Sequence, residues 1–263
     1  MNGNTTNFNK ISDLTCECER ISGLPFKVKT EDFLHYSVSR MDINEREGEF
    51  VGRPSGRYVS FFFGRADELD GEAIHDIASA VADELSSLAK RVSAKRSSNL
   101  KIAAFGLGNR AVCYDSFGPL ACEMTLPGSK LTVFKAGVPS ESGLKTSELL
   151  RCVVRCFGAE LAVAADSLVA RSEERVGRVI QLCDSGVNAG SGVGNHADRI
   201  DRASLGVPVI AVGIPTALFL DGGLRESGYL AVSPNAEAIA RAGAEIISRS
   251  LMMAFGEKQP KSE

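Results

Sequence analysis

The chain has 263 residues, enough for one large α/β domain or two small ones, and its 44% hydrophobic and 24% charged residues are ordinary for a globular protein. The net charge is −3 and the basic residues are dispersed, which argues against a nucleic-acid surface and leaves proteins or small molecules as the expected partners. No stretch reaches the ~18 apolar residues of a membrane helix, and residues 1–10 are polar and Asn-rich, unlike a signal peptide, so a cytoplasmic location is expected.

Seven cysteines, an odd number, fit the reduced thiols of that compartment better than a disulfide framework. Cys16 and Cys18 form a C-x-C pair that could contribute to a zinc site. No second ligand pair with zinc spacing accompanies them, and the three histidines are scattered, so no structural metal is expected.

Strand and helix patterns alternate along the chain. Short apolar runs bounded by turn residues predict strands, and apolar residues at helical spacing predict helices. The predicted strands are residues 57–63, 100–105, 131–134, 160–165, 178–183 and 207–212. The predicted helices are residues 70–91, 146–157 and 235–255, the second capped by Thr146 or Ser147. This order predicts an α/β fold, with a mainly parallel twisted central sheet and helices on both faces.

In parallel sheets, functional groups gather outside the carboxyl ends of the strands, and three loops are notable there. The first loop, Gly106-Leu107-Gly108-Asn109, leads to Asp115. It resembles part of a dinucleotide fingerprint, but its third glycine is replaced by Ala111 and the next strand lacks the acidic residue that would bind ribose. A tight turn explains the glycines equally well and leaves Asp115 unexplained.

The second loop begins with Asp166, directly after the apolar run 160–165. A carboxylate in this position is costly to bury unless it is paired or solvated in a cleft. A helix N-cap is the alternative role.

The third loop, residues 184–196, has four glycines in nine residues between Gly186 and Gly194. Such a backbone can direct N–H groups at an anionic oxygen. Ser191 raises the alternative of a serine hydrolase, but the surrounding residues are not G-x-S-x-G.

Together these segments resemble the germination protease family of spore-forming bacteria. The most specific runs are ADSLVAR and GSGVGN, at residues 165–171 and 190–195, with SLGVPVIAVGIPT at residues 204–216. Four further segments agree in order along most of the chain: residues 52–60, 106–119, 142–148 and 232–239.

The resemblance implies an atypical aspartic-type endopeptidase with a fold similar to that of hydrogenase-maturation peptidases. Its two implicated aspartates correspond to Asp115 and Asp166. Family members cleave small acid-soluble spore proteins after an acidic residue during germination in the spore. They form homotetramers, and they are made as zymogens that lose a short propeptide.

Three departures from the family pattern bear on substrate preference. Cys113-Tyr114 stands where the family has Thr-Pro, Lys145 replaces a glutamate, and the connection between Pro119 and Gly137 is short. Loss of the proline removes a fixed φ angle beside a working side chain.

Two carboxylates can hydrolyse an amide if one keeps its proton, because like charges held close raise the pKa of one of them. The glycine loop, with Gly190, Gly192, Gly194 and Asn195, is the expected source of oxyanion donors. Side chains of Asn109 and Arg171 are expected to support oxyanion or substrate binding. No cofactor is expected. Two alternatives are a metal-dependent maturation-type peptidase, with His196 as the nearby imidazole, and a non-catalytic peptide-binding sporulation protein.

The N-terminal stretch ISDLTCE, residues 11–17, resembles the family's processing segment, an acidic residue followed by apolar ones. The expected cut lies between Asp13 and Leu14. Residues 1–13 are then a propeptide, and residues 14–263 a single α/β peptidase domain.

Overall fold

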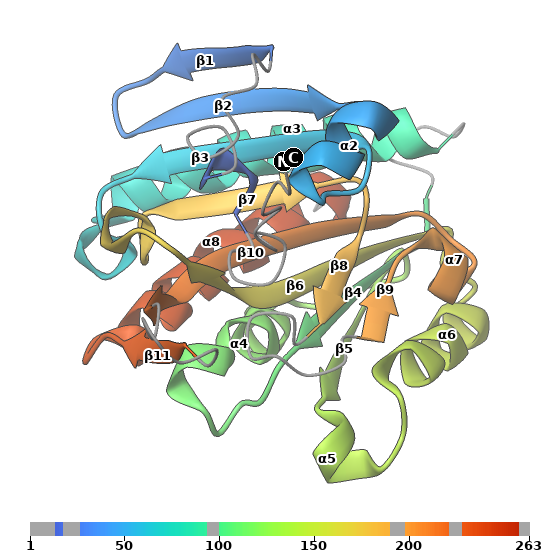
Figure 1. Ribbon diagram of the computed structural model, residues 1–263. Helices are drawn as coiled ribbons and strands as arrows, with labels where there is room; N and C mark the ends of the chain where they lie inside the picture. The colour runs from blue at the N-terminus through green and yellow to red at the C-terminus, as the bar shows by residue number, and fades with distance from the viewer. Residues whose placement is uncertain (1–13, 18–26, 94–99, 190–197, 221–227, 258–263) are drawn as a thin grey trace, which may run out of the picture.

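The computed structural model describes residues 14–17, 27–93, 100–189, 198–220 and 228–257. A twisted nine-stranded sheet runs through it in the order β1-β2-β3-β7-β10-β6-β4-β5, with β11 paired to β10 (Figure 1). A separate two-stranded sheet, β8-β9, lies against this main sheet in the same view. The strands are β1 (Val28–Asp32), β2 (Tyr36–Ile43), β3 (Gly56–Phe63), β4 (Ile102–Leu107), β5 (Leu131–Gly137), β6 (Leu161–Ala170), β7 (Val179–Cys183), β8 (Val187–Ala189), β9 (Asp198–Ile200), β10 (Val209–Leu220) and β11 (Tyr229–Val232).

The sheet is mixed, which corrects the expectation of a mainly parallel one. Strands β10, β6, β4 and β5 are mutually parallel. Strands β1, β2, β3, β7 and β11 each join a neighbour in antiparallel fashion. The short connection from β6 to β7 holds only the turn η5 (Glu173–Arg175), and a parallel return would have required a longer crossover.

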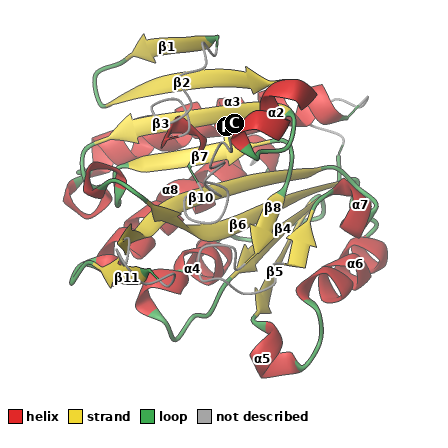
Figure 2. Cartoon of the chain, viewed as in Figure 1, coloured by secondary structure: helices red, strands yellow, loops and turns green. Residues whose placement is uncertain are grey.

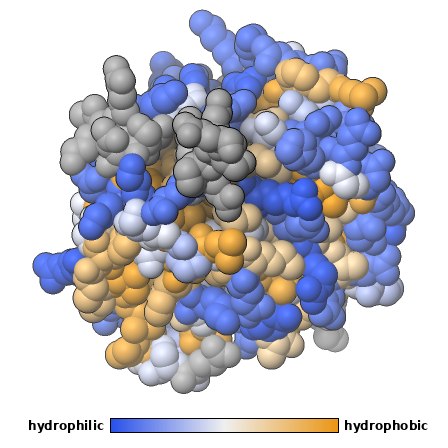
Figure 3. Space-filling view, turned by 180° about the vertical axis from the view of Figure 1, so that it is seen from behind, coloured by the Kyte–Doolittle hydropathy of each residue, from blue (hydrophilic) through white to orange (hydrophobic). Residues whose placement is uncertain are grey.

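Helices cover both faces of the sheet, as predicted (Figure 2). The long helices α3 (Gly71–Val92) and α8 (Ala236–Phe255), with α4 (Phe117–Met124), bury the larger apolar core against one face. Figure 3 views the molecule from behind and shows mostly hydrophilic residues with several apolar patches. On the other face α6 (Thr146–Phe157) and α7 (Arg202–Leu205) bury a smaller core against β4, β6 and β10. The remaining helical segments are α2 (Glu45–Val51), η2 (Ala66–Glu68), η4 (Cys113–Asp115) and α5 (Pro139–Ser142).

Most predicted elements are present. Strand β10 continues to Leu220, well beyond the predicted end at residue 212, and two further details differ. Strand β6 continues through Asp166 to Ala170, so this aspartate lies within the strand instead of after it and does not cap a helix. Neither Thr146 nor Ser147 caps α6, because helix α6 begins at Thr146 and its N-cap is Lys145. The Ser147 N–H instead donates to the carboxylate of Asp198, 2.6 Å away on β9.

Within the part of the chain that the structure describes, no helix is long and apolar enough to span a bilayer. The predicted propeptide, residues 1–13, lies outside the described residues, as do Asp13 and Cys18.

Candidate active site

Asp166 lies on a polar row that crosses the sheet. Ser60 on β3 pairs with Gln181 on β7, Gln181 with Gly213 on β10, and Gly213 with Asp166 on β6. Residues in direct register point to the same face, so these side chains share one side of the sheet. Ser60, Gln181 and Asp166 are all buried. Gly213 has no side chain, so it leaves a depression in the sheet surface between the side chains of Gln181 and Asp166.

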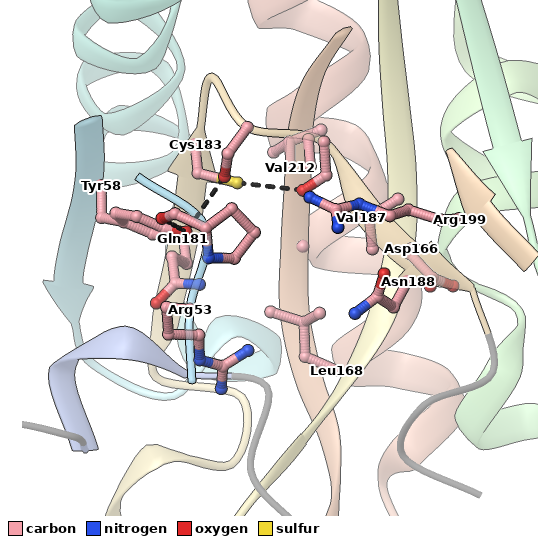
Figure 4. A pocket seen from close by; sticks show the side chains of 15 residues that line it. Arg53, Tyr58, Asp166, Leu168, Gln181, Cys183, Val187, Asn188, Arg199 and Val212 are labelled. Carbon is pink, nitrogen blue, oxygen red and sulfur yellow. Dashed lines mark hydrogen bonds between the residues drawn. The ribbon is translucent and has the colours of Figure 1, made fainter. Parts of the chain in front are cut away.

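A cavity opens over this row (Figure 4). Asp166, Leu168, Gln181 and Gly213 belong to its lining, together with Asn188 from β8. Its volume is about 70 Å³, room for a few water molecules or one side chain. The cavity therefore places a buried carboxylate beside a space that water or part of a substrate can enter.

Two arginines line the same cavity, Arg53 from the turn before β3 and Arg199 from β9. Figure 4 shows their side chains on opposite sides of the cavity. The Arg199 guanidinium also contacts Asp201, with 2.7 Å between Nε and the carboxylate oxygen. The positive charges favour an anionic group in the cavity, because guanidinium groups bind carboxylates with strong, directional hydrogen bonds.

Tyr58 and Cys183 close another part of the cavity. The Tyr58 hydroxyl donates to the carbonyl of Pro54 at 2.7 Å and lies 3.0 Å from the Ser185 hydroxyl. The Cys183 thiol donates to the Gly186 carbonyl at 3.3 Å. Burial raises the pKa of both Tyr58 and Cys183, so both stay protonated and neutral near pH 7. The thiol is therefore not an activated nucleophile.

Asp115 lies in the turn η4, beyond the carboxyl end of β4. Strands β4 and β6 are parallel neighbours, and Gly106 near the end of β4 pairs with Ala165, the residue before Asp166. The Asp115 carboxylate accepts the Asn109 N–H at 2.8 Å. Burial raises the pKa of Asp115, and this hydrogen bond partly offsets the rise. Asp166 thus lies on β6, and Asp115 lies in the loop that follows the parallel neighbour β4. Asp115 is not among the residues that line the cavity.

Glycines let the Asp115 loop come this close to the sheet. A Cβ on Gly106 would lie 2.3 Å from the Gly118 carbonyl oxygen, and one on Gly118 would lie 2.3 Å from that of Ala165. Gly108 has a φ of 98°, and its Cβ would meet the Asp115 carboxylate at 2.6 Å. These contacts explain the G-x-G-N turn as close packing around an aspartate, without a nucleotide.

The other predicted site residues have different outcomes. The Asn109 side chain accepts the Ala111 N–H at 2.8 Å and so shapes its own turn. Arg171 supplies its main-chain N–H to the carboxylate of Glu17 at 3.0 Å. Gly190, Gly192, Gly194, Asn195, Ser191 and His196 lie outside the described residues.

Sequence reasoning did not single out Arg53, Arg199 or Gln181. Gln181 carried a usable signal, a polar residue in the apolar run VIQLC, because buried polar side chains need a reason. Arg53 falls in one of the segments that carried the family resemblance, at residues 52–60. No local sequence pattern marked Arg199 as a site residue, because it reaches the cavity through the pairing of β9 with β8.

The structure thus defines an α/β protein with a mixed sheet and a buried carboxylate in a cavity rimmed by arginines. The family model described as germination protease matches residues 6–221. The chain therefore belongs to the germination protease family.

Curated relatives agree with this assignment. The germination protease of Oceanobacillus iheyensis is 32% identical over 215 residues, which cover 76% of this chain and 58% of that protein. The germination protease of Bacillus subtilis is 30% identical over 208 residues, covering 73% and 56%, and that of Priestia megaterium is 34% identical over 213 residues, covering 75% and 56%. The chain thus spans between 56% and 58% of the length of these three relatives.

One solved structure, the [NiFe] hydrogenase maturation protease HycI from Thermococcus kodakarensis, is 18% identical, with a TM-score of 0.38. The match covers 58% of this chain and 92% of that one.

Proposed function

We propose that the protein is an endopeptidase that cleaves small acid-soluble spore proteins during germination, with Asp115 and Asp166 as its catalytic pair. The observation that carries the proposal is the position of Asp166, buried on the floor of a cavity with an arginine on either side. Membership of the germination protease family supports the reaction and the substrate class. The proposal includes assembly as a homotetramer and activation by loss of the N-terminal segment.

The two carboxyl groups have different environments, which suits different roles. Asp166 takes a proton from a water molecule in the cavity, and the resulting hydroxide attacks the substrate carbonyl. Asp115 acts in its protonated form, which burial favours by raising its pKa, and donates that proton to the leaving amide nitrogen. After this step Asp166 carries the proton and Asp115 is ionised, and proton exchange with water restores both groups for the next turnover. Main-chain N–H groups of the glycine loop, with Gly190, Gly192 and Gly194, remain the proposed oxyanion donors.

Arg53 and Arg199 are proposed to hold the acidic residue that precedes the scissile bond. Both side chains line the cavity, and guanidinium groups bind carboxylates through strong, directional hydrogen bonds.

The deciding experiment incubates purified protein with a small acid-soluble spore protein and identifies the products by mass spectrometry. We expect cleavage after acidic residues. Asp115→Asn and Asp166→Asn should each lower the rate by about 10²–10⁴-fold, the usual contribution of general acid–base catalysis. Asp32→Asn, at an exposed position on the edge strand β1, is the matched control and should retain full activity.

Other results would change the assignment. Full activity in Asp115→Asn would remove this residue from the pair. Absence of any cleavage, with peptide binding intact, would favour a non-catalytic peptide-binding protein.

A further inference from the structure

Strand β10 contains a β-bulge at Thr216. In the ladder with β6, Pro215 pairs with Leu168. The next pair joins Ala217 to Val169, so Thr216 is an extra residue between the two pairs. A bulge bends its strand and redirects a side chain, and bulges are frequent next to active sites. Thr216 is fully buried, so its hydroxyl requires an acceptor inside the protein.

That acceptor lies in the turn η4, which holds Asp115. The Thr216 hydroxyl donates to the main-chain carbonyl of Tyr114 at 2.5 Å, and Tyr114 directly precedes Asp115. Tyr114 has no proline ring to fix its φ angle, so hydrogen bonds must set the main-chain conformation of the turn. The Asp115 N–H closes the turn on itself by donating to the Val112 carbonyl at 2.9 Å. The Thr216 hydrogen bond adds a connection from the turn to the central sheet.

The same strand also meets Asp166. Gly213 of β10, three residues before Thr216, pairs with Asp166 on β6. The bulge is itself held in place, because the Pro215 carbonyl accepts the Gly177 N–H at 2.8 Å. Strand β10 is therefore joined to the strand that carries one proposed catalytic carboxyl and to the main chain beside the other.

We propose that Thr216 is a positioning residue for the peptidase reaction, and that its hydroxyl holds the main chain at Tyr114 so that the Asp115 carboxyl keeps its place relative to Asp166. This inference rests on the proposed peptidase function. Catalytic groups must be held within about 0.5 Å of the productive geometry by the groups that support them. Thr216 acts through Asp115 and not by touching the substrate, since it is not among the residues that line the cavity.

The first test compares two substitutions at position 216. Thr216→Val keeps the shape of the side chain and loses the hydroxyl, and Thr216→Ser keeps the hydroxyl. With a small acid-soluble spore protein as the substrate, Thr216→Val should lower kcat about 10- to 100-fold, because a small displacement of a catalytic group has an effect of this size. KM should be unchanged, because the residue does not line the cavity. Thr216→Ser should keep most of the parent's kcat.

Thr125→Val is the matched control for the loss of a buried hydroxyl. The Thr125 side chain is buried, and its hydroxyl donates to the Ala121 carbonyl at 2.7 Å at the end of α4. Thr125→Val removes a hydrogen bond of the same kind outside the Asp115 turn, so it should leave kcat unchanged. Urea unfolding measures the loss of stability in the two valine variants and checks that both are folded under the assay conditions.

A double substitution tests whether Thr216 acts through Asp115. Residues that act as one unit are not additive in their effects on the rate. Asp115→Asn lacks the proposed proton donor, so adding Thr216→Val to it should lower the residual rate no further.

The titration of Asp115 gives a readout that does not require activity. Burial raises the pKa of this carboxyl in the parent. A less restrained turn lets water reach the carboxyl, so its pKa should be lower in Thr216→Val than in the parent. Carbon-13 NMR of the aspartate carboxyls measures this change, with Asp115→Asn used to assign the resonance.

Several results would overturn the inference. These are an unchanged kcat in Thr216→Val, an equal loss of kcat in Thr125→Val, and a Thr216→Ser variant as slow as Thr216→Val. A loss in the Asp115→Asn background as large as that in the parent would also overturn it. A parent that cleaves nothing would overturn the peptidase proposal, and the NMR titration then decides the hold on Asp115. A lower Asp115 pKa in Thr216→Val would keep that hold, and an unchanged pKa would overturn it.

Discussion

At the scale of single residues, the site is marked by polar groups in places where burial is costly. Asp166 and Gln181 stand on strands whose other residues are mostly apolar and buried. Polar side chains are costly to bury among apolar ones, so buried polar residues in largely apolar strands are candidates for a functional role. Gly213 between them has the same implication, since a larger residue would fill the cavity floor and its Cβ would lie 2.6 Å from Leu168.

Asp115 allows a prediction about stability and pH. Its pKa in the folded protein is raised by burial, so the folded state binds a proton more readily than the unfolded state. Its contribution to stability is therefore greatest at low pH and is lost as the pH rises through the folded pKa. Asp115→Asn should be more stable than the parent at pH 7, because asparagine keeps an acceptor for the Asn109 N–H without a buried charge.

Urea unfolding of the two proteins at pH 7 and pH 4 measures this effect. The advantage of Asp115→Asn should shrink toward pH 4, where the parent residue is increasingly protonated. A variant less stable than the parent at pH 7 would contradict the predicted cost of the buried charge.

At the scale of elements, helix α6 depends on a side chain from another part of the chain. The N-cap residue, Lys145, makes no side-chain hydrogen bond to the first turn of the helix. The Ser147 N–H instead donates to the carboxylate of Asp198 on β9. The small β8-β9 sheet, which carries Asn188 and Arg199 to the cavity, is thereby tied to the helix.

Asp198→Ala should lower the free energy of unfolding by about 1 kcal/mol, the usual cost of a lost N-terminal cap. Asp198→Asn is the matched control, and it should lose less, because its amide oxygen can still accept the Ser147 N–H. Urea unfolding of both variants at pH 7 gives the comparison. Equal losses in the two would mean that charge, and not the hydrogen bond, accounts for the contribution of Asp198.

At the scale of the whole molecule, the positions of possible metal ligands bear on whether the protein needs a metal. The described residues contain no group of three His, Cys, Asp or Glu side chains that could hold a metal ion. We expect chelators of zinc and nickel to leave the proposed peptidase activity unchanged. Cleavage assays with and without chelator test this, and activity lost to a chelator and restored by one metal would support a metallopeptidase instead.

The N-terminal segment leads to a prediction about activation. We expect the bond between Asp13 and Leu14 to be cut and the precursor to be less active than the product. Because Leu14 is buried and Thr15 and Glu17 are hydrogen-bonded to the body of the protein, the new N-terminus should stay docked after the cut. Mass measurement and N-terminal sequencing after incubation at mildly acidic pH would detect the cut. Fully active protein that retains Met1 would rule out processing as a requirement.

The sequence alone was sufficient for the α/β class, for most of the longer helices and strands, and for the family. Helices α3, α6 and α8 have long amphipathic repeats, and the core strands are apolar runs between turn residues, so local periodicity specifies them. The short or polar elements escaped prediction: β1, β2, α2, α4, α7, β8, β9 and β11. Their patterns are too brief or too polar to stand out.

Only the tertiary structure decided how the sheet is ordered and what surrounds Asp166. Strand direction depends on which strands pair, and β7 joins β3 to β10 from distant parts of the chain. The polar row and the cavity exist because register aligns Ser60, Gln181, Gly213 and Asp166 across four strands. Arg199 and Arg53 line one cavity although they are far apart in the sequence, and no local pattern in a sequence encodes such a meeting.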